Sequence, residues 1–161
     1  MDLSGPVNTS GLLMRDGLRA AFLEANLAGG VRGHKLALHT LDDHYDGLTC
    51  RSNTQQLLQS LDVTALVGYY GSGTSQQALP LAEASGVPLV GAYSGADFLR
   101  SPFTPYAVNV RASYGDEVIA LVDYLLRNTT FTKISIFYQN DRSPLGCFVL
   151  YFVFVARLGC Q

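Results

Sequence analysis

Glycines and small hydroxyl residues are concentrated in one turn of this chain, Gly71-Ser72-Gly73-Thr74-Ser75. A short apolar run ending at Gly68 precedes the turn, and a helical pattern follows it. A helix N-terminus carries unpaired N–H groups and a partial positive charge, so such a turn can hold a carboxylate or another small anion. At the carboxyl end of a strand in an open parallel sheet, the turn lies where ligands bind. We therefore interpret it as a ligand cradle rather than a catalytic centre.

The sequence contains neither of the two catalytic motifs that its glycine-rich turn could suggest. A serine-hydrolase elbow needs glycines two residues either side of the nucleophile, and Ser72 lacks them. No Walker lysine is present, and no Gly-x-Gly-x-x-Gly follows a predicted strand, so nucleotide chemistry has no signature. We expect no cofactor and no enzymatic activity.

Two groups of residues suggest metal binding, but a plainer interpretation is favoured for each. His34, His39 and His44 recur every fifth residue, a spacing that alternates faces on a strand, so a zinc site is not expected. The acidic turn 42–46 lacks the ligand pattern of a calcium loop and is interpreted as a solvated turn.

Composition fits one ordinary domain. The 161 residues are 48% apolar, enough to build a core, and the net charge of −2 argues against nucleic acid as a partner. Cys50, Cys147 and Cys160 have neither metal-site nor redox spacing and are interpreted as buried or incidental thiols, although one pair could form a disulfide. The residues 1–6 do not resemble a signal peptide, which leaves a cytosolic protein or a sequence without its true beginning.

Hydrophobic periodicity predicts an alternation of strands and helices. Helices are expected over 11–28, 48–60, 116–127 and from the cradle turn to Ser85, with strands over 35–41, 65–68, 88–92, 106–110 and 133–138. Ser10 is the expected N-cap of the first helix. Both faces of the strand 35–41 are fairly apolar, as for a strand covered on both sides. Crossovers of helix length force parallel pairing, so the fold class is a doubly wound α/β parallel sheet.

Several short segments match a known pattern in order and spacing: Leu3-Ser4-Gly5-Pro6, the turn 29–36, Asp42-Asp43, Leu66-Val67-Gly68, the cradle turn, the segment 82–90 and Asn109-Val110-Arg111-Ala112. Over roughly residues 3–146 the chain resembles the first lobe of periplasmic binding proteins of the leucine/isoleucine/valine-binding kind, which also serve as ligand-binding regions of receptors. The resemblance implies a type I periplasmic-binding-protein fold, with the first lobe over about 1–112 and the start of the second over about 113–146.

The resemblance also implies a function and a site. Family members bind amino acids between two lobes, act with an ABC permease or a receptor signalling domain, and work on the periplasmic or extracellular side of the membrane. By position, Ser72, Gly73 and Thr74 would hold the ligand's carboxylate, and Ser94 and Gly95 would meet its amine or flank. Charge-assisted bonds from a hydroxyl and backbone N–H groups agree with that role.

The chain also departs from the family. The first strand and most of the second lobe are not found, and Tyr45 and Gly71 stand where some members have a cysteine pair. The segment 147–161 matches no family element. Its apolar run suggests either translation past a splice error or frameshift, or a strand that fills the gap left by the first strand.

Alternative hypotheses remain open at this point. The pair Asp42-Asp43 follows a predicted strand and suggests a doubly wound enzyme or a phospho-receiver-like domain that holds Mg²⁺. A non-functional gene fragment is the third hypothesis.

Overall fold

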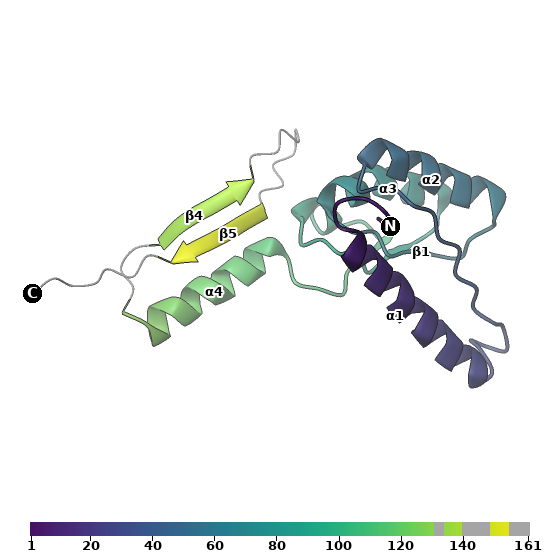
Figure 1. Cartoon of the computed structure of the whole chain (residues 1–161), viewed down its shortest axis with the longest axis horizontal. Helices are drawn as coiled ribbons and strands as arrows, with labels where there is room; N and C mark the ends of the chain where they lie inside the picture. The colour runs from purple at the N-terminus through teal and green to yellow at the C-terminus, as the bar shows by residue number, and fades with distance from the viewer. Residues whose placement is uncertain (131–133, 140–148, 155–161) are drawn as a thin grey trace, which may run out of the picture. The chain divides into compact units, whose positions relative to one another are not determined.

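The computed structural model describes residues 1–130, 134–139 and 149–154, which fall into two units, residues 1–111 and 112–161 (Figure 1). The helices are α1 (Asn8–Leu27), α2 (Gly47–Ser60), α3 (Ser72–Ser85) and α4 (Tyr114–Asn128), with a 3₁₀ turn over Asp97–Leu99. The strands are β1 (Leu66–Val67), β2 (Leu89–Val90), β3 (Ala107–Val108), β4 (Ile134–Gln139) and β5 (Val149–Phe154). None of the helices in the described residues is both long and apolar enough to span a bilayer.

The first unit is built on a short parallel sheet. Its strand order is β1-β2-β3, with Leu66 paired to Leu89 and Leu89 to Ala107. Figure 1 shows α2 and α3 together on one side of this sheet and α1 on the other. The expected parallel α/β architecture is confirmed, because both strand pairs are parallel.

The core lies between α3 and the sheet. Ala78 and Ala82 of α3 are fully buried, and their small side chains let the helix approach Leu66 and Leu89 closely. The neighbouring helix α2 contributes Cys50, as the prediction of a buried thiol requires. Helix α3 ends where the prediction places it, because Gly86 adopts a left-handed conformation that glycine allows.

The start of α1 differs from the prediction. The helix begins at Asn8, its N-cap is Val7 without a side-chain cap, and Ser10 lies inside the helix. The carboxylate of Asp2 accepts the N–H groups of Gly5 (2.5 Å) and Val7 (2.8 Å), both of which precede the helix. The prediction of Ser10 as N-cap was therefore wrong, because the N–H groups of Ser10 and Gly11 already donate to the Val7 carbonyl and the helix starts before Ser10.

The predicted strand over 35–41 is extended but belongs to no sheet among the described residues. Leu36, Leu38 and Thr40 are half-buried, whereas the residues that alternate with them, from Lys35 to His39, are exposed. The expectation of burial on both faces was wrong. An extended segment needs a neighbouring strand to form a ladder, and here a cavity separates the segment from β1.

The N-terminal residues are tied to the acidic turn that follows this segment. The ammonium group of Met1 lies 3.0 Å from a carboxylate oxygen of Asp43, and both side chains are only 3% exposed. Asp42 accepts hydrogen bonds from the N–H groups of Leu3 (2.9 Å) and His44 (3.0 Å) and from the Ser4 hydroxyl (2.7 Å). These bonds hold the start of the chain against the carboxyl edge of the sheet.

The second unit contains α4 and an antiparallel pair of strands. A capping box of Ser113 and Asp116 starts α4. Strand β4 pairs with β5 from Ile134 opposite Phe154 to Gln139 opposite Val149. The apolar segment near the end of the chain is thus a strand over 149–154, but its partner is β4, so the hypothesis that it fills the gap beside β1 was wrong. The other residues of the segment 147–161 lie outside the described residues.

Replacement of Gly71 tests the geometry of the turn before α3. Gly71 has φ +91, and an added Cβ would lie 2.7 Å from the Tyr45 ring. We expect Gly71→Ala to lower the free energy of unfolding by about 1–3 kcal/mol in urea titrations, because both strain and overlap act against it. Gly17→Ala is the control: this α1 glycine has open space around it, and we expect the substitution to stabilise by about 0.5–1 kcal/mol. Equal changes in the free energy of unfolding from Gly71→Ala and Gly17→Ala would contradict a strained conformation at Gly71.

Acid titration tests the anchoring of the N-terminal residues. Burial raises the pKa of Asp42, but hydrogen bonds from Leu3, Ser4 and His44 outweigh it and lower the pKa from 3.8 to about 2. A carboxyl whose pKa is lower in the folded state stabilises the fold above its unfolded pKa, and that stabilisation is lost as the pH falls through the folded pKa. We therefore expect the stability difference between the wild type and Asp42→Asn to be constant above about pH 5, to shrink as the pH falls, and to vanish only below about pH 2. A stability difference between the two proteins that does not change with pH would contradict the lowered pKa of Asp42.

Candidate functional site

The loops that follow β1 and β2 meet at the carboxyl edge of the parallel sheet. Beyond the two strands, Tyr70 and Tyr93 form an isolated parallel bridge, so the pairing continues into both loops. Ser72 begins α3 and Ser94 follows Tyr93, and their hydroxyl oxygens lie 2.8 Å apart. The structure therefore brings together one predicted residue from each of the two loops.

The hydrogen bonds of this serine pair leave one proton unused. The Ser94 hydroxyl oxygen accepts the N–H group of Ala96 at 3.1 Å, and Ser94 is fully buried. When Ser94 donates its own proton to Ser72, the hydroxyl proton of Ser72 is left to donate elsewhere. Ser72 is 8% exposed and Ser94 is 0% exposed, so Ser72 is the member of the pair that a ligand can reach.

The first turn of α3 offers main-chain donors beside Ser72. Gly71 is the N-cap and provides no side-chain cap, and within the described residues no acceptor satisfies the N–H groups of Ser72, Gly73 and Thr74. Gly73 is exposed, and an added Cβ there would meet nothing within 4 Å. Uncapped donors, a free hydroxyl and open space together can hold an anion.

The Thr74 side chain bonds within the turn itself. Its hydroxyl donates to the carbonyl oxygens of Tyr70 (2.5 Å) and Gly71 (3.1 Å), and the residue is buried. The hydroxyl of Ser75 also donates to Gly71, at 2.7 Å. Both side chains hold the turn, so Thr74 can offer a ligand only its main-chain N–H. Gly95 is buried beside Ser94.

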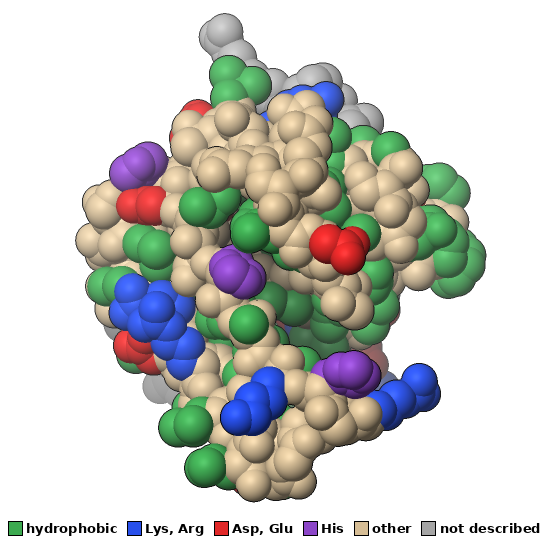
Figure 2. All heavy atoms as spheres, turned by 90° about the vertical axis from the view of Figure 1, so that its right-hand side faces the viewer, with side chains coloured by type: hydrophobic (Ala, Val, Ile, Leu, Met, Phe, Trp, Pro, Cys, Tyr) green, Lys and Arg blue, Asp and Glu red, His purple; other side chains and the backbone are tan. Residues whose placement is uncertain are grey.

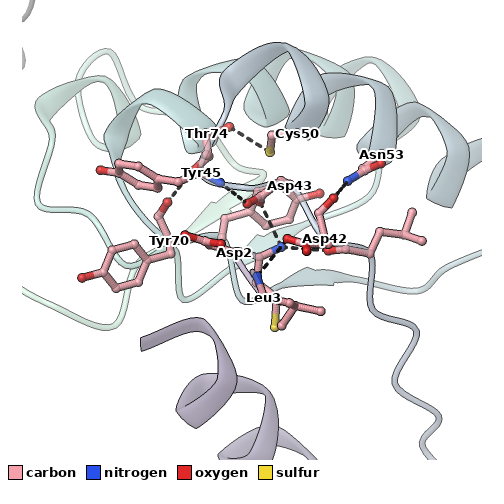
Figure 3. Close-up of polar contacts among 12 residues, drawn as sticks. Asp2, Leu3, Asp42, Asp43, Tyr45, Cys50, Asn53, Tyr70 and Thr74 are labelled. Atoms are coloured by element: carbon pink, nitrogen blue, oxygen red, sulfur yellow. Dashed lines mark hydrogen bonds and ion pairs between the residues drawn. The ribbon is translucent and has the colours of Figure 1, made fainter. Parts of the chain in front are cut away.

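Three tyrosines and an arginine form a wall that sequence reasoning missed. The rings of Tyr70 and Tyr93 are stacked with centroids 5.0 Å apart, Tyr45 meets Tyr70 edge-on at 5.9 Å, and Arg111 lies 5.4 Å from the Tyr93 centroid. Figure 3 shows Tyr45 and Tyr70 extending from the turn region on the same side as Thr74. A signal was available for two of them, because Tyr93 directly precedes Ser94 and Tyr70 lies two residues before Ser72. Tyr45 also packs over Gly71, so the two positions that carry cysteines in some relatives are in contact.

The acidic pair does not form a site of the kind that phosphoryl transfer requires. The Asp43 carboxylate pairs with the Met1 ammonium and accepts the N–H of Tyr45 at 3.0 Å, and Asp42 is occupied by the three donors described above (Figure 3). In the described part of the chain, no group of three His, Cys, Asp or Glu side chains could hold a metal ion.

A buried thiol lies below the turn. The thiol of Cys50 donates to the carbonyl oxygen of Thr74 at 3.6 Å. Burial, together with the charge of Asp43, raises the pKa of Cys50 to about 12. The thiol is therefore a structural group rather than a nucleophile.

Comparisons with known proteins identify the family of the chain. The family model for periplasmic binding proteins matches residues 1–146. A possible leucine/isoleucine/valine-binding protein from Rhodopirellula baltica is 37% identical with a TM-score of 0.73, over 79% of this chain and 34% of its own. An extracellular ligand-binding receptor from Verminephrobacter eiseniae is 28% identical with a TM-score of 0.72, over 78% of this chain and 36% of its own.

A third structure contains a bound ligand. The branched-chain amino acid transporter substrate-binding protein LivJ from Streptococcus pneumoniae, solved with isoleucine, is 30% identical with a TM-score of 0.54, over 55% of this chain and 26% of its own. No match was found among curated proteins. The chain spans about a third of the length of the first two structures. With the family model covering most of its residues, the chain belongs to the periplasmic binding protein family.

Proposed function

We propose that the chain is the ligand-holding first lobe of a solute-binding receptor, and that it binds the carboxylate of an amino-acid-like molecule at the start of α3. The observation that carries this proposal is the Ser72–Ser94 hydroxyl pair, 2.8 Å apart, beside the uncapped N–H groups of the same helix turn. A carboxylate has two oxygens, which the Ser72 hydroxyl and the N–H groups near Gly73 and Thr74 can share. Each hydrogen bond to a charged group contributes about 1.5–3 kcal/mol.

Ser94 has a positioning role in this proposal. Because it is fully buried behind Ser72, it does not contact the ligand through its side chain. In the proposed arrangement its oxygen accepts the Ala96 N–H and its own proton is donated to Ser72. This orients the Ser72 proton outward, toward the open space at Gly73.

The hydrogen-bonding partners of Ser72 favour binding over catalysis. A nucleophilic serine needs an adjacent base, and the partner of Ser72 is a second hydroxyl rather than a histidine or a carboxylate. The remaining hydroxyls of the turn, on Thr74 and Ser75, donate to main-chain carbonyls. Ligand capture without bond making or breaking is the chemistry these groups support.

The wider role follows from the family. Closure of a second lobe over the ligand would bury it and signal to an ABC permease or a receptor signalling domain, on the periplasmic or extracellular side. The isolated chain lacks the contacts of that closed state. Its affinity for an amino acid is therefore expected to be in the millimolar range.

A charge at Gly73 tests the anion site without weakening the helix. Gly73→Asp places a carboxylate in the open space of the first turn, where the helix dipole stabilises a negative charge. We expect unchanged or higher thermal stability and loss of the saturation-transfer NMR signal from L-leucine. Gly73→Asn, of equal size but neutral, is the matched control and should retain most of the signal. Binding that survives Gly73→Asp, or no binding by the wild type at tens of millimolar ligand, would contradict the proposal.

Removal of single hydroxyls tests the serine pair. Ser72→Ala should weaken L-leucine binding about tenfold, because a charge-assisted bond is lost. Ser94→Ala should also weaken binding and should lower stability by about 1–3 kcal/mol, since the buried Ala96 N–H loses its acceptor. Ser75→Ala is the control, because that buried hydroxyl donates only to Gly71. A larger effect on binding from Ser75→Ala than from Ser72→Ala would exclude the proposed contact.

A further inference from the structure

Arg100 binds two main-chain carbonyls that belong to different segments of the first unit. Figure 2 shows the usual place of lysine and arginine side chains, which project from the surface of the molecule. Arg100 instead is half-buried: its Nη1 donates to the Ala96 carbonyl at 3.0 Å and its Nη2 to the Arg111 carbonyl at 2.8 Å. A planar guanidinium has donors in fixed directions, so it sets the arrangement of the groups it binds. Arg100 therefore fixes Ala96 and Arg111 relative to each other.

One end of this link lies at the candidate site. Ala96 donates its N–H to the Ser94 hydroxyl at 3.1 Å, and that hydroxyl is bonded to the hydroxyl of Ser72 at 2.8 Å. Ser72, Ser94 and Ala96 are all buried, so bulk water competes little for these bonds. A displacement of Ala96 therefore changes both its hydrogen bond to Ser94 and its hydrogen bond to Arg100.

The other end lies where the chain leaves the first unit. Arg111 is the last residue of that unit and follows β3 by three positions. Its side chain lies over the Tyr93 ring, with the guanidinium carbon 5.4 Å from the ring centroid. Because Tyr93 directly precedes Ser94, the main chain and the side chain of Arg111 both contact the loop that carries the site.

We propose that Arg100 is a positioning residue for the carboxylate site, and that it makes ligand binding and the main-chain conformation at Arg111 interdependent. The inference rests on the proposed function and adds to it a residue that acts through Ala96. A carboxylate that accepts the Ser72 proton selects one arrangement of the serine pair and Ala96, and the guanidinium carries this restraint to the Arg111 carbonyl. The coupling is reciprocal, so a restraint on Arg111 also favours the ligand-binding arrangement of the serine pair.

NMR signals of the isotope-labelled full chain, titrated with L-leucine, test the proposal. In the wild type, the Ala96 amide signal and the Arg111 carbonyl signal should move along one saturation curve, because a single event changes both. Arg100→Lys keeps the positive charge but loses the two diverging donors. In this variant the Ala96 signal should still move, the Arg111 signal should lose most of its response, and the Kd should rise about threefold or more.

Asn109→Ala is the matched control. Asn109 joins the same two segments at another point, because its side-chain amide donates to the Leu99 carbonyl at 2.7 Å. This bond involves neither Ala96 nor Arg111. The variant should therefore keep the Kd of the wild type and the coupled response at Arg111, even where its melting temperature is lower.

Four results would overturn the proposal. If the Ala96 signal of the wild type moves and the Arg111 signal does not, the ligand binds but Arg100 has no coupling role. This result needs no variant, so it decides even if Arg100→Lys does not fold. A full Arg111 response in Arg100→Lys shows that another contact carries the coupling. Equal losses of affinity in Arg100→Lys and Asn109→Ala show that both side chains only stabilise the loop. If neither signal of the wild type responds at tens of millimolar L-leucine, the proposed function fails and the inference fails with it.

Discussion

The site depends on the parallel pairing of β1 with β2, which does not stop where the two strands end. Tyr93 donates to the Tyr69 carbonyl at 2.8 Å, and Gly71 donates to the Tyr93 carbonyl at 3.1 Å. These two bonds hold the following loops side by side, so that Ser72 and Ser94 meet although 22 positions separate them in the chain. The left-handed conformation of Gly71 then turns the chain into α3 directly beside the second loop. Loss of the pairing would separate the hydroxyls, whatever happened to the helix.

The same loops divide their hydroxyl groups between two tasks. Thr74 and Ser75 donate inward to carbonyls of the turn, which makes the turn rigid, and Ser72 is left to face outward. A rigid turn keeps the main-chain donors in a fixed direction, which lowers the entropy cost of ordering them around a ligand. Small side chains serve this arrangement, since a larger group at Gly71 would collide with Tyr45. Beside the turn, the rings of Tyr70 and Tyr93 stack on each other, and the Arg111 guanidinium lies over Tyr93.

Much of the fold could be predicted from sequence, because periodicity and turn residues are local signals. The helix α3 and its cradle turn follow from the apolar run before Gly68 and the left-handed Gly86, and the structure has both. The failures concern interactions distant in sequence. Ser10 looks like an N-cap, but the helix already begins at Asn8, after a segment whose Val7 N–H donates to the distant carboxylate of Asp2. The extended segment 35–41 has the apolar alternation of a strand, but a strand exists only when a neighbour completes its ladder.

The meeting of the two predicted loops could be foreseen from sequence, whereas the hydrogen-bond partners of their residues could not; that the loops bind a ligand stays a prediction. Ser72 and Ser94 were expected in the same site from their loops, and the hydroxyl pair agrees with that placement. The inward rotation of Thr74 could not be read from sequence, because a threonine on the first turn can bond either a ligand or the preceding carbonyls. The tyrosine wall was missed because each ring has its partner on a different loop.

The reactivity of the Cys50 thiol reports on local opening of the structure beneath the candidate site. Its thiol lies against the carbonyl of Thr74, between α2 and the turn that carries the proposed ligand donors. A thiolate forms there only when the two helices separate, since burial suppresses ionisation while they are packed. The rate at which an alkylating reagent labels this sulfur therefore measures how often the layer beneath the site opens. A molecule that tightens the first turn of α3 would slow that labelling without ever touching the sulfur.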